Sequence, residues 1–471
     1  MTTPWLDDAC SLVEAFRAGK ISPLEALEEC IEAIERSPLN AFSHTDFERA
    51  RETARGADVS LPFGGVPFGI KELERVRDWP YTEASMLFKD RVSDHDQTSI
   101  ARLRRTGAVF AGQTTASEFG GINCTSTTLH GTTRNPWNQD RTPGGSSGGT
   151  AAAVAGGLLP IATGSDGGGS IRIPAGFSGL FGLKATYGRI PKGPSAGVEP
   201  LTSVLGCLSR SVRDTARFFD ACNGFDQRDP LSLPAVGGWE AALGTSEIAG
   251  RTVAILPDLG TARVRAEVAE TVATAGSELA KAAGLKVIDV TPSLPPLRGQ
   301  WAMAGTVSFV VDLGDAYPDR IEELSPEMRL GLESTRVRFN LDRAAAIEAY
   351  RRKLNEAMAD LFEAADFVIA SANPDVAFAA EGPPPSTIPG ADLIHELGFA
   401  KAIMNNAALT APSNLNGSPA ISLPLGLVDG LPVGLQVLAA HHREQSLLDL
   451  ALVAERELAW PKVAPGSPHA G

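Results

Sequence analysis

The chain lacks an excess of positive charge. Its 471 residues carry 42 Lys and Arg against 56 Asp and Glu, which gives a formal net charge of −14. Nucleic-acid binding needs a positively charged face, so this balance argues against a nucleic-acid partner. Hydrophobic residues make up 43% and charged residues 21%, as in ordinary globular proteins, which excludes intrinsic disorder.

A long hydrophobic run and an export signal are also missing. The most apolar stretch, Gly149 to Gly164, is rich in Ala and Gly and is shorter than the roughly 20 residues that span a bilayer. The first residues, MTTPWLDD, contain neither a basic segment nor an apolar one. We therefore predict a cytoplasmic protein with no membrane partner.

Cysteine and histidine are scarce. The five cysteines have no CxxC spacing and their number is odd, a pattern that does not indicate a disulfide or zinc framework. Among the 7 histidines, the pair His441 and His442 lacks the HExxH spacing of a zinc site. No motif indicates a metal or an organic cofactor, and we predict neither.

Strand and helix patterns alternate along the chain. Ser22 in SPLE starts a helix as its N-cap, with proline at the first helical position and glutamate three residues after the cap. The other predicted elements are strands at 65–70, 108–113, 251–256, 285–290, 367–370, 420–425 and 431–437, and helices at 96–105 (capped by Asp96), 263–283 and 342–364. This alternation predicts an α/β fold whose helices cover a mostly buried sheet.

Glycine is concentrated in one region. Of 48 glycines, 14 lie between Gly144 and Gly188, within the block GGSSGGTAAAVAGGLLPIATGSDGGGSIRIPA and just after it. A phosphate-binding loop would need a lysine that this block does not supply. Gly144 to Gly148 fits the GxSxG nucleophile elbow, but RTP stands where an apolar strand should precede it, and no histidine has a distinctive context.

A third interpretation of the glycine-rich block is a site in which two of its serines act together. From Ser147 the Ala-rich segment can form a helix of about 11 residues, rising roughly 17 Å. Leu159 to Ser165 can return as a strand of about 20 Å. Ser146 and Ser170 can therefore face one another at the same end of the sheet.

The turn before Ser170 and a distant lysine complete this interpretation. Gly167, Gly168 and Gly169 have no side chains, so their N–H groups can approach an oxyanion, as acyl transfer requires. A glycine-rich tight turn without chemistry is the structural alternative. Lys71 ends an apolar strand, and a desolvated lysine can serve as the base for a serine nucleophile.

These residues resemble the amidase signature family. GVPFGIK before and at Lys71 matches its lysine motif, and GGSSGG followed by GSDGGGSIRIPA matches its glycine and serine signature. The segments GTTRNPWN, GLFGLKATYGRI, NGSPAISLPLG and GLPVGLQV also resemble the family, so the similarity extends over about residues 22–461. It implies the amidase signature fold, a large mixed sheet covered on both faces by helices.

The resemblance also implies roles for individual residues. Ser170 would be the nucleophile, Ser146 the bridging serine after a cis peptide bond from Gly145, and Lys71 the base. Gly167, Gly168 and Gly169 would form the oxyanion hole. Ser147, Asp166 and Arg172 would support the site, and Gly120, Gly121 and Ser165 would border the substrate. A small amide would be the substrate, and a homodimer is an open possibility.

One domain is predicted from residue 1 to 460, with N-terminal helices at about 5–55 and the signature core at about 65–190. From Pro461 on, the chain is predicted to form a loose tail.

The family contains both free amidases and the A-type component of the amidotransferase, which is a glutaminase in tRNA-dependent Gln or Asn formation. The tyrosine-rich stretch typical of that component is missing from the comparable region, GTVSFVVDLGDAYPDR from Gly305. We therefore predict an amidase that acts alone on linear amides. Cyclic amides, aryl acylamides, carbamates and esters are open alternatives as substrates, and the A-type, glutaminase component of the amidotransferase is an open alternative as a function. A cysteine amidase using Cys124 and a non-catalytic binding protein are rival hypotheses.

Overall fold

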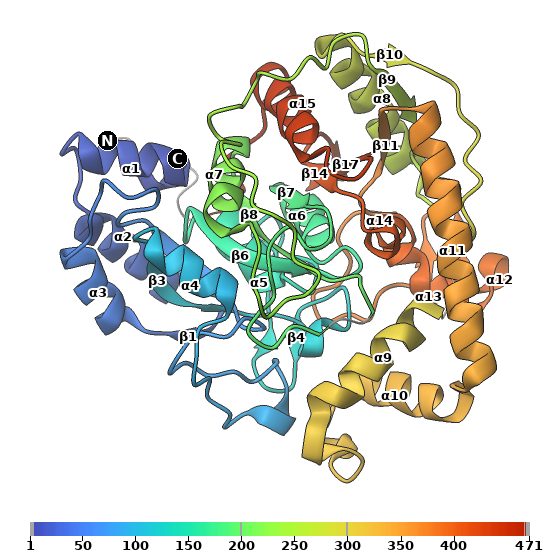
Figure 1. Ribbon diagram of the computed structural model, residues 1–471, viewed down its shortest axis with the longest axis horizontal. Helices are drawn as coiled ribbons and strands as arrows, with labels where there is room; N and C mark the ends of the chain where they lie inside the picture. The colour runs from blue at the N-terminus through green and yellow to red at the C-terminus, as the bar shows by residue number, and fades with distance from the viewer. Residues whose placement is uncertain (1–3, 198–199, 298–299, 466, 468–471) are drawn as a thin grey trace.

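A sheet of eleven strands runs through the computed structural model, which describes residues 4–197, 200–297, 300–465 and 467. Helices cover both of its faces (Figure 1). The strands in spatial order are β1 (Phe42–Thr45), β3 (Val109–Thr114), β2 (Pro67–Lys71), β6 (Ile161–Asp166), β8 (Val204–Ser209), β7 (Phe181–Lys184), β14 (Ala420–Leu423), β17 (Leu435–Ala439), β11 (Phe367–Ser371), β9 (Thr252–Ile255) and β10 (Lys286–Val287). The predicted α/β fold with a mixed sheet is confirmed.

The order of parallel strands decides where polar side chains gather. β2 pairs in parallel with both β3 and β6, and Lys71 lies opposite Thr114. The carboxyl ends of these three strands therefore meet at one edge of the sheet. Ligand sites of open α/β sheets form at such edges, because loops with free polar groups follow the strand ends.

The helices form an outer layer around this sheet. They are α1 (Ala9–Arg17), α2 (Pro23–Arg36), α3 (Phe47–Arg55), α4 (Thr98–Arg105), α5 (Gly148–Ala155), α6 (Arg172–Ser178), α7 (Val212–Cys222), α8 (Ala266–Ala282), α9 (Gln300–Leu313), α10 (Pro326–Arg338), α11 (Leu341–Ala364), α12 (Leu393–Leu397), α13 (Phe399–Ala408), α14 (Ala411–Asn416) and α15 (Glu444–Glu457). Within the described residues, no helix combines the length and hydropathy needed to cross a bilayer.

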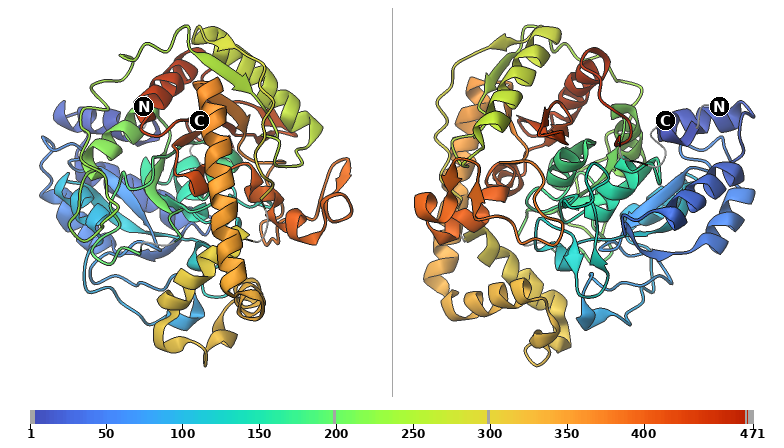
Figure 2. Two further views of the ribbon diagram at one scale, coloured as in Figure 1. Left: turned by 45° about the vertical axis from the view of Figure 1, so that its right-hand side comes forward. Right: turned by 180° about the vertical axis from the view of Figure 1, so that it is seen from behind.

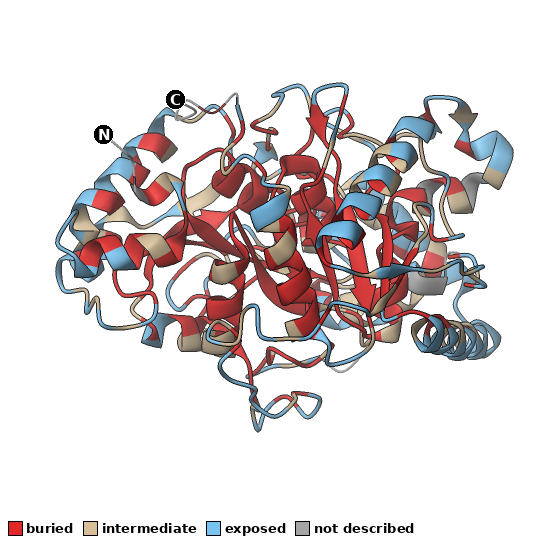
Figure 3. Ribbon diagram, turned by 90° about the horizontal axis from the view of Figure 1, so that it is seen from above, coloured by how far each residue is buried: buried red, intermediate tan, exposed pale blue. Residues whose placement is uncertain are grey.

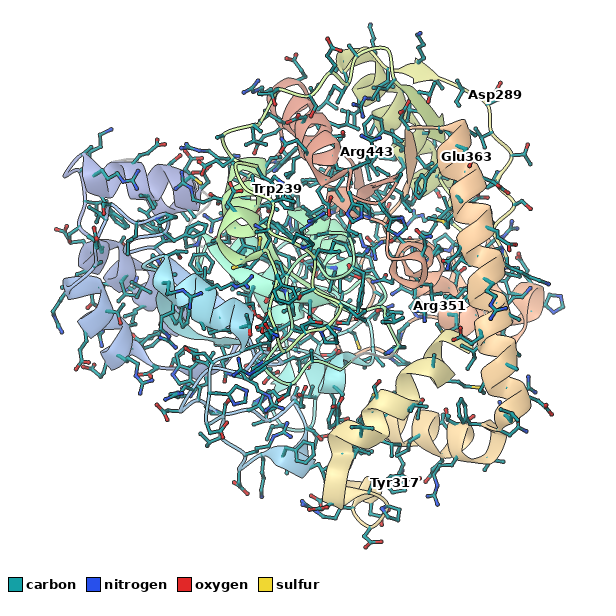
Figure 4. The ribbon with its side chains drawn as sticks, viewed as in Figure 1. Trp239, Asp289, Tyr317, Arg351, Glu363 and Arg443 are labelled. Carbon is teal, nitrogen blue, oxygen red and sulfur yellow. The ribbon has the colours of Figure 1, made fainter. Side chains whose placement is uncertain are left out.

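Three short ribbons and one projecting helical arm complete the fold. The ribbons pair β4 (Ser126–Thr127) with β5 (Gly131–Thr132), β12 (Thr387–Ile388) with β13 (Ala391–Asp392), and β15 (Leu427–Val428) with β16 (Leu431–Pro432). Helices α9 and α10 project from the body next to the long helix α11 (Figure 2). Arg351 on α11, labelled in Figure 4, donates to the backbone carbonyls of Leu415 and Pro200 and so fastens α11 to the body.

Buried residues concentrate in the sheet and on the inner faces of its helices (Figure 3). The largest hydrophobic cluster joins the sheet to α1, α2, α4, α7 and α15. Phe68, Phe181 and Phe219 within it are fully buried, and each such side chain contributes about 1.5–3 kcal/mol of transfer free energy. This core gives the strand ends a rigid base.

Helix α5 has eight residues, shorter than predicted, because Gly156 and Gly157 end it, the latter at a φ of +76°. The buried Arg210 guanidinium donates to the carbonyls of Val154 and Leu159 at this end. The predicted strand follows at Ile161–Asp166. The chain therefore returns to the edge from which α5 departed, as predicted.

The segment after Pro461 differs from the predicted loose tail in its described part. Ala464 is buried and donates its N–H to Ala155 O at 2.8 Å, and Ser467 Oγ donates to Gly156 O at 2.6 Å. These bonds use carbonyls left free at the end of α5, which is why this segment docks there. The organisation of residues 1–460 as one domain stays a prediction, supported by the continuous sheet.

Two local predictions are corrected and one is confirmed. The carboxylate of Asp96 does not cap α4, because it accepts hydrogen bonds from Arg77 N and Arg104 Nε, and α4 begins after Gln97 without a side-chain cap. The strand predicted at 431–437 divides into β16 and β17. In the sequence, the small β15–β16 ribbon connects β14 to β17, and these two strands pair directly in the large sheet. The capping box of Ser22 and Glu25 is present as predicted.

Candidate active site

Lys71 lies at the carboxyl end of β2 and is fully buried. Its Nζ forms hydrogen bonds with Ser146 Oγ at 2.7 Å, Ser147 Oγ at 2.9 Å and Ser165 Oγ at 2.9 Å. The backbone N–H of Lys71 donates to Thr163 Oγ1 on the neighbouring strand β6. One amine is therefore held by three hydroxyl groups, two of them from the segment before α5.

Burial sets the protonation of this amine. Removal from water disfavours the charged form and lowers the pKa of Lys71 from 10.5 to about 8. Carboxylates of Glu74, Asp166, Glu72 and Glu83 oppose this shift without cancelling it. At pH 7, about one tenth of Lys71 is therefore an uncharged amine that can accept a proton.

Ser146 follows the cis peptide bond from Gly145 that the resemblance predicts, and the side chain is nearly completely buried. The loop at 117–122 wraps around it, because Ser117 N donates to Ser146 O at 3.2 Å. A Cβ on Gly120 would lie 3.3 Å from Ser146 Oγ. Gly120 thus borders Ser146, where a side chain would crowd the serine hydroxyl.

The segments that carry Ser146 and Ser170 lie together, as predicted. A Cβ on Gly144 would lie only 2.8 Å from Pro174 Cα in the first turn of α6, so the two backbones are in close contact. Ser170 precedes this turn and has 7% of its surface exposed, against 2% for Ser146. None of the described residues hydrogen-bonds Ser170 Oγ, which leaves this hydroxyl free to react.

Asp166 and Arg172 form a fully buried ion pair that braces the turn between them. Arg172 Nε donates to Asp166 Oδ2 at 2.9 Å and Nη2 donates to Oδ1 at 3.0 Å. The field of Arg172 overcomes the effect of burial and holds the pKa of the Asp166 carboxyl well below its usual range. Buried charges are tolerated only when paired in this way.

The turn presents free N–H groups beside Ser170. None of the described residues accepts a hydrogen bond from the N–H of Gly167, Gly168 or Ser170. The N–H of Gly169 is different, since it donates to Asp166 Oδ1 at 2.7 Å. Because this N–H is already used, Gly169 does not fit its predicted role as an oxyanion donor. Gly169 instead allows the backbone to turn, because its φ of +128° favours glycine.

The predicted substrate-bordering residues lie at this edge in different ways. Ser165 is partly exposed and hydrogen-bonds Lys71, while Gly120 contacts Ser146. Gly121 lies under Met328 of α10, whose Sδ would be 2.3 Å from a Cβ there. The projecting helices therefore reach the loop next to Ser146.

Apolar side chains lie on both sides of the two serines. On one side, Phe119 meets Phe309 of α9 edge to face at 4.7 Å between ring centroids, in a cluster that includes Met328. On the other side, Ile173 of α6 packs in a second cluster with Ile122, Cys124, Phe177, Ala377 and Phe378. Apolar clusters therefore lie next to the polar network of Lys71, at the loop that borders Ser146 and in the helix that follows Ser170.

Cys124 does not have the properties of a nucleophile. It is buried in that second cluster, and burial raises the pKa of its thiol to about 12. A thiol in this state is inert, because the thiolate is the reactive form. Burial and the raised pKa therefore weigh against the cysteine hypothesis.

Several residues that hold the site come from the C-terminal part and are absent from the sequence-based prediction. Arg172 Nη1 donates to Gln436 Oε1 and Nη2 donates to Asn414 Oδ1, both at 2.6 Å, while Thr410 Oγ1 donates to Gly168 O. Gln436 is a polar residue within the apolar strand β17, which is a pattern that could have revealed it. Asn414 and Thr410 have no comparable pattern.

Comparisons with known proteins agree with this geometry. Residues 25–448 match the protein family described as Amidase. The A-type component of glutamyl-tRNA(Gln) amidotransferase from Thermus thermophilus is 32% identical over 476 residues, covering 94% of this chain and 95% of that protein. A bacterial aryl acylamidase of the amidase signature family superposes with a TM-score of 0.89 at 26% identity, covering 98% of both chains. For 6-aminohexanoate cyclic dimer hydrolase, the TM-score is 0.85 at 28% identity, covering 98% of this chain and 99% of that one.

Proposed function

The chain belongs to the amidase family and acts on amides, and we propose that it hydrolyses them through an acyl-enzyme formed on Ser170. The observation that carries the proposal is the 2.7 Å hydrogen bond between the buried Nζ of Lys71 and Ser146 Oγ. It joins a base of lowered pKa to the hydroxyl of Ser146, whose segment is in close contact with the segment that follows Ser170.

In the acylation step, neutral Lys71 accepts the hydroxyl proton of Ser146 while Ser146 accepts that of Ser170. Ser170 Oγ then forms a bond to the carbonyl carbon of the amide. The negative charge passes to the carbonyl oxygen, which the N–H groups of Gly167, Gly168 and Ser170 can stabilise. Such preorganised donors cost no reorganisation during the reaction.

Collapse of this intermediate breaks the C–N bond, and the proton held by Lys71 and Ser146 passes to the leaving nitrogen. Water then attacks the carbonyl carbon of the Ser170 ester and gives its proton to the same relay. The relay returns a proton to Ser170 Oγ as the bond between this oxygen and the acyl carbon breaks, and the acid is released. Ser147 and Ser165 hold the amine of Lys71 toward Ser146, and the pair Asp166–Arg172 keeps the turn in place. Each proton taken up is thus returned.

The apolar clusters support amides with an aryl or alkyl group as substrates. Phe119, Phe309 and Met328 offer aromatic and thioether surface next to Gly120, where an apolar group of the substrate would be removed from water. The superposition on an aryl acylamidase agrees with this substrate class.

A second candidate function is that of the A-type, glutaminase component of an amidotransferase. The 32% identity to the Thermus thermophilus protein favours it. The missing tyrosine-rich stretch and the net charge of −14 weigh against it. The two functions differ in the acyl group, since glutamine carries two charges that an apolar surrounding would leave unpaired.

The test is a panel of aryl amides, alkyl amides, carbamates, esters and glutamine, with Ser170→Ala as the blank. We expect turnover of aryl or alkyl amides by the wild-type protein and none above background by the blank. Hydrolysis of glutamine alone would favour the second candidate. Turnover by Ser170→Ala equal to that of the wild type would exclude Ser170 as the nucleophile.

A further inference from the structure

Thr410 is a fully buried threonine that takes no part in the proton transfers of the proposed mechanism. It lies directly before α14, far from the glycine-rich block in the sequence. Its hydroxyl donates to Gly168 O at 2.6 Å, whereas the next acceptor, Ala407 O, lies at 3.3 Å. Gly168 O is therefore the nearer partner, and this bond joins the C-terminal part of the chain to the turn before Ser170.

The peptide unit between Gly168 and Gly169 is held on both sides. Its carbonyl oxygen accepts the hydrogen bond from Thr410, and its N–H donates to Asp166 Oδ1 at 2.7 Å. A trans peptide unit is planar, with its C=O and N–H on opposite sides. Two bonds to these groups therefore fix the orientation of the whole unit.

The next peptide unit carries a free N–H group of the turn. Gly169 O accepts a hydrogen bond from Ile173 N at 2.7 Å, in the first turn of α6. The N–H of Ser170 belongs to the same unit and points away from this carbonyl, because the peptide bond is trans. On the other side of the held unit, the N–H of Gly168 is likewise without an acceptor among the described residues. The held unit thus lies between two free donors.

The glycines of the turn make these hydrogen bonds necessary. Gly168 and Gly169 have no side chains, so steric contacts alone would leave their backbone several orientations. A Cβ on Gly169 would lie only 2.4 Å from Thr410 Oγ1, so the hydroxyl could not approach a larger residue in this way. The hydroxyl of Thr410 therefore supplies an order that the glycines themselves do not provide.

Thr410 is itself held by the buried ion pair. Arg172 Nη1 donates to Thr410 O at 3.0 Å, and Ser413 Oγ donates to the same oxygen at 3.1 Å. Asp166, the partner of Arg172, binds the N–H side of the held peptide unit directly. The ion pair therefore acts on both sides of this unit, on one side through its carboxylate and on the other through Thr410.

We propose that Thr410 is a positioning residue of the oxyanion hole, whose hydroxyl directs the N–H groups of Gly168 and Ser170 toward the carbonyl oxygen of the substrate. The inference rests on the proposed function, since it requires Ser170 to be the nucleophile. Thr410 acts through the backbone of the turn. Without its hydroxyl, the peptide unit after Gly168 loses one of its two bonds, and the donors on either side of it lose their fixed direction.

The test is the rate at which a tagged fluorophosphonate labels Ser170, because the phosphoryl oxygen gains negative charge as an amide oxygen does. Thr410→Val removes the hydroxyl and keeps the size of the side chain. Because small misplacements of reacting groups are costly, we expect its maximal labelling rate to fall by about 10- to 100-fold. The probe concentration that gives half of this rate should stay within about twofold of the wild-type value, since ground-state binding is unaffected.

Phenylboronic acid gives an independent measurement, because it forms a tetrahedral, negatively charged adduct with a serine hydroxyl. Its inhibition constant should rise by about tenfold in Thr410→Val, as expected for a ligand that resembles the transition state. Thr410→Ser keeps the hydroxyl and should restore both the labelling rate and the inhibition constant.

Thr106→Val is the matched control. Thr106 is also buried, and its hydroxyl also donates to a backbone carbonyl, Leu103 O, at 2.5 Å. It lies before the amino end of β3, whereas the site lies at the carboxyl end of this strand. We expect Thr106→Val to keep the wild-type labelling rate.

Labelling carried to completion separates positioning from stability. A variant that is only less stable would label a smaller fraction of the protein at the wild-type rate, whereas we expect Thr410→Val to label the wild-type fraction slowly. Thr410→Ala, which also lacks the hydroxyl, gives a second measurement if Thr410→Val is poorly folded. A wild-type rate in the variants without the hydroxyl, or an equal loss in Thr410→Ser, would overturn the inference.

The same experiment distinguishes the inference from the proposed function. If wild-type Ser170 is not labelled, or if Ser170→Ala hydrolyses amides as fast as the wild type, the proposed function fails. If wild-type Ser170 is labelled and the Thr410 variants keep its rate, only the inference about Thr410 fails.

Discussion

The protonation of Lys71 gives the most quantitative prediction. With its pKa at about 8 instead of 10.5, the neutral fraction at pH 7 is about one tenth, roughly 300-fold above that of an exposed lysine. If neutral Lys71 is the base, kcat/KM should rise about tenfold per pH unit below pH 8 and level above it. Lys71→Met should lack this rise.

The same shift predicts an effect on stability. Because the pKa is lower in the folded protein, the lysine destabilises the fold below about pH 8, and this cost disappears as the pH rises from 8 towards 10.5. The shift of 2.5 units corresponds to about 3 kcal/mol when complete. Between pH 7 and pH 9.5, the unfolding free energy of the wild type should therefore gain about 2 kcal/mol relative to that of Lys71→Met.

Urea unfolding followed by tryptophan fluorescence, together with initial rates on one amide at each pH, measures both effects. The difference between pH values isolates ionisation from the hydrogen bonds that Lys71→Met also removes. A wild-type kcat/KM that is flat from pH 6 to about pH 9 would refute the assignment of Lys71 as the base. So would an unaltered rise in the Lys71→Met variant.

Three further predictions concern the turn and its surroundings. Gly169→Ala places a Cβ 2.4 Å from the hydroxyl oxygen of Thr410 and should lower kcat by about 100-fold. Gly167→Ala is the control, because its Cβ would have no neighbour nearer than 3.8 Å, and it should stay active. Equal kcat values for the two variants would contradict the steric argument. Arg172→Met leaves the Asp166 carboxylate buried without its cation and should cost about 3–5 kcal/mol in urea unfolding, part of which Asp166→Asn should restore in the double variant. Cys124→Ala should retain turnover, and loss of acyl-enzyme formation in this variant would revive the cysteine hypothesis.

The sequence predicts the elements that follow local rules. Ser22 caps α2 because its neighbours supply both halves of a capping box. Lys71 could be selected as the candidate base because a charged residue at the end of an apolar strand is unusual. The two serine segments could be brought together from helix and strand lengths alone.

Long-range partners could not be predicted in this way. Asp96 satisfies every local rule for an N-cap, yet its carboxylate binds Arg104 and the backbone of Arg77. Asn414 contacts Arg172 across 242 residues of sequence, and nothing near Asn414 in the sequence indicates this. Such contacts depend on packing, which a single sequence does not reveal.

The two ends of the chain meet at the turn that ends α5. Trp5 Nε1 donates to Gly157 O, and Ser467 Oγ donates to Gly156 O. The described parts of the two terminal segments therefore contact the same turn. A circular permutant that joins them through a short linker and opens at an exposed loop should keep both contacts. A truncation before Ala464 should instead loosen the helix that positions Ser146 and Ser147.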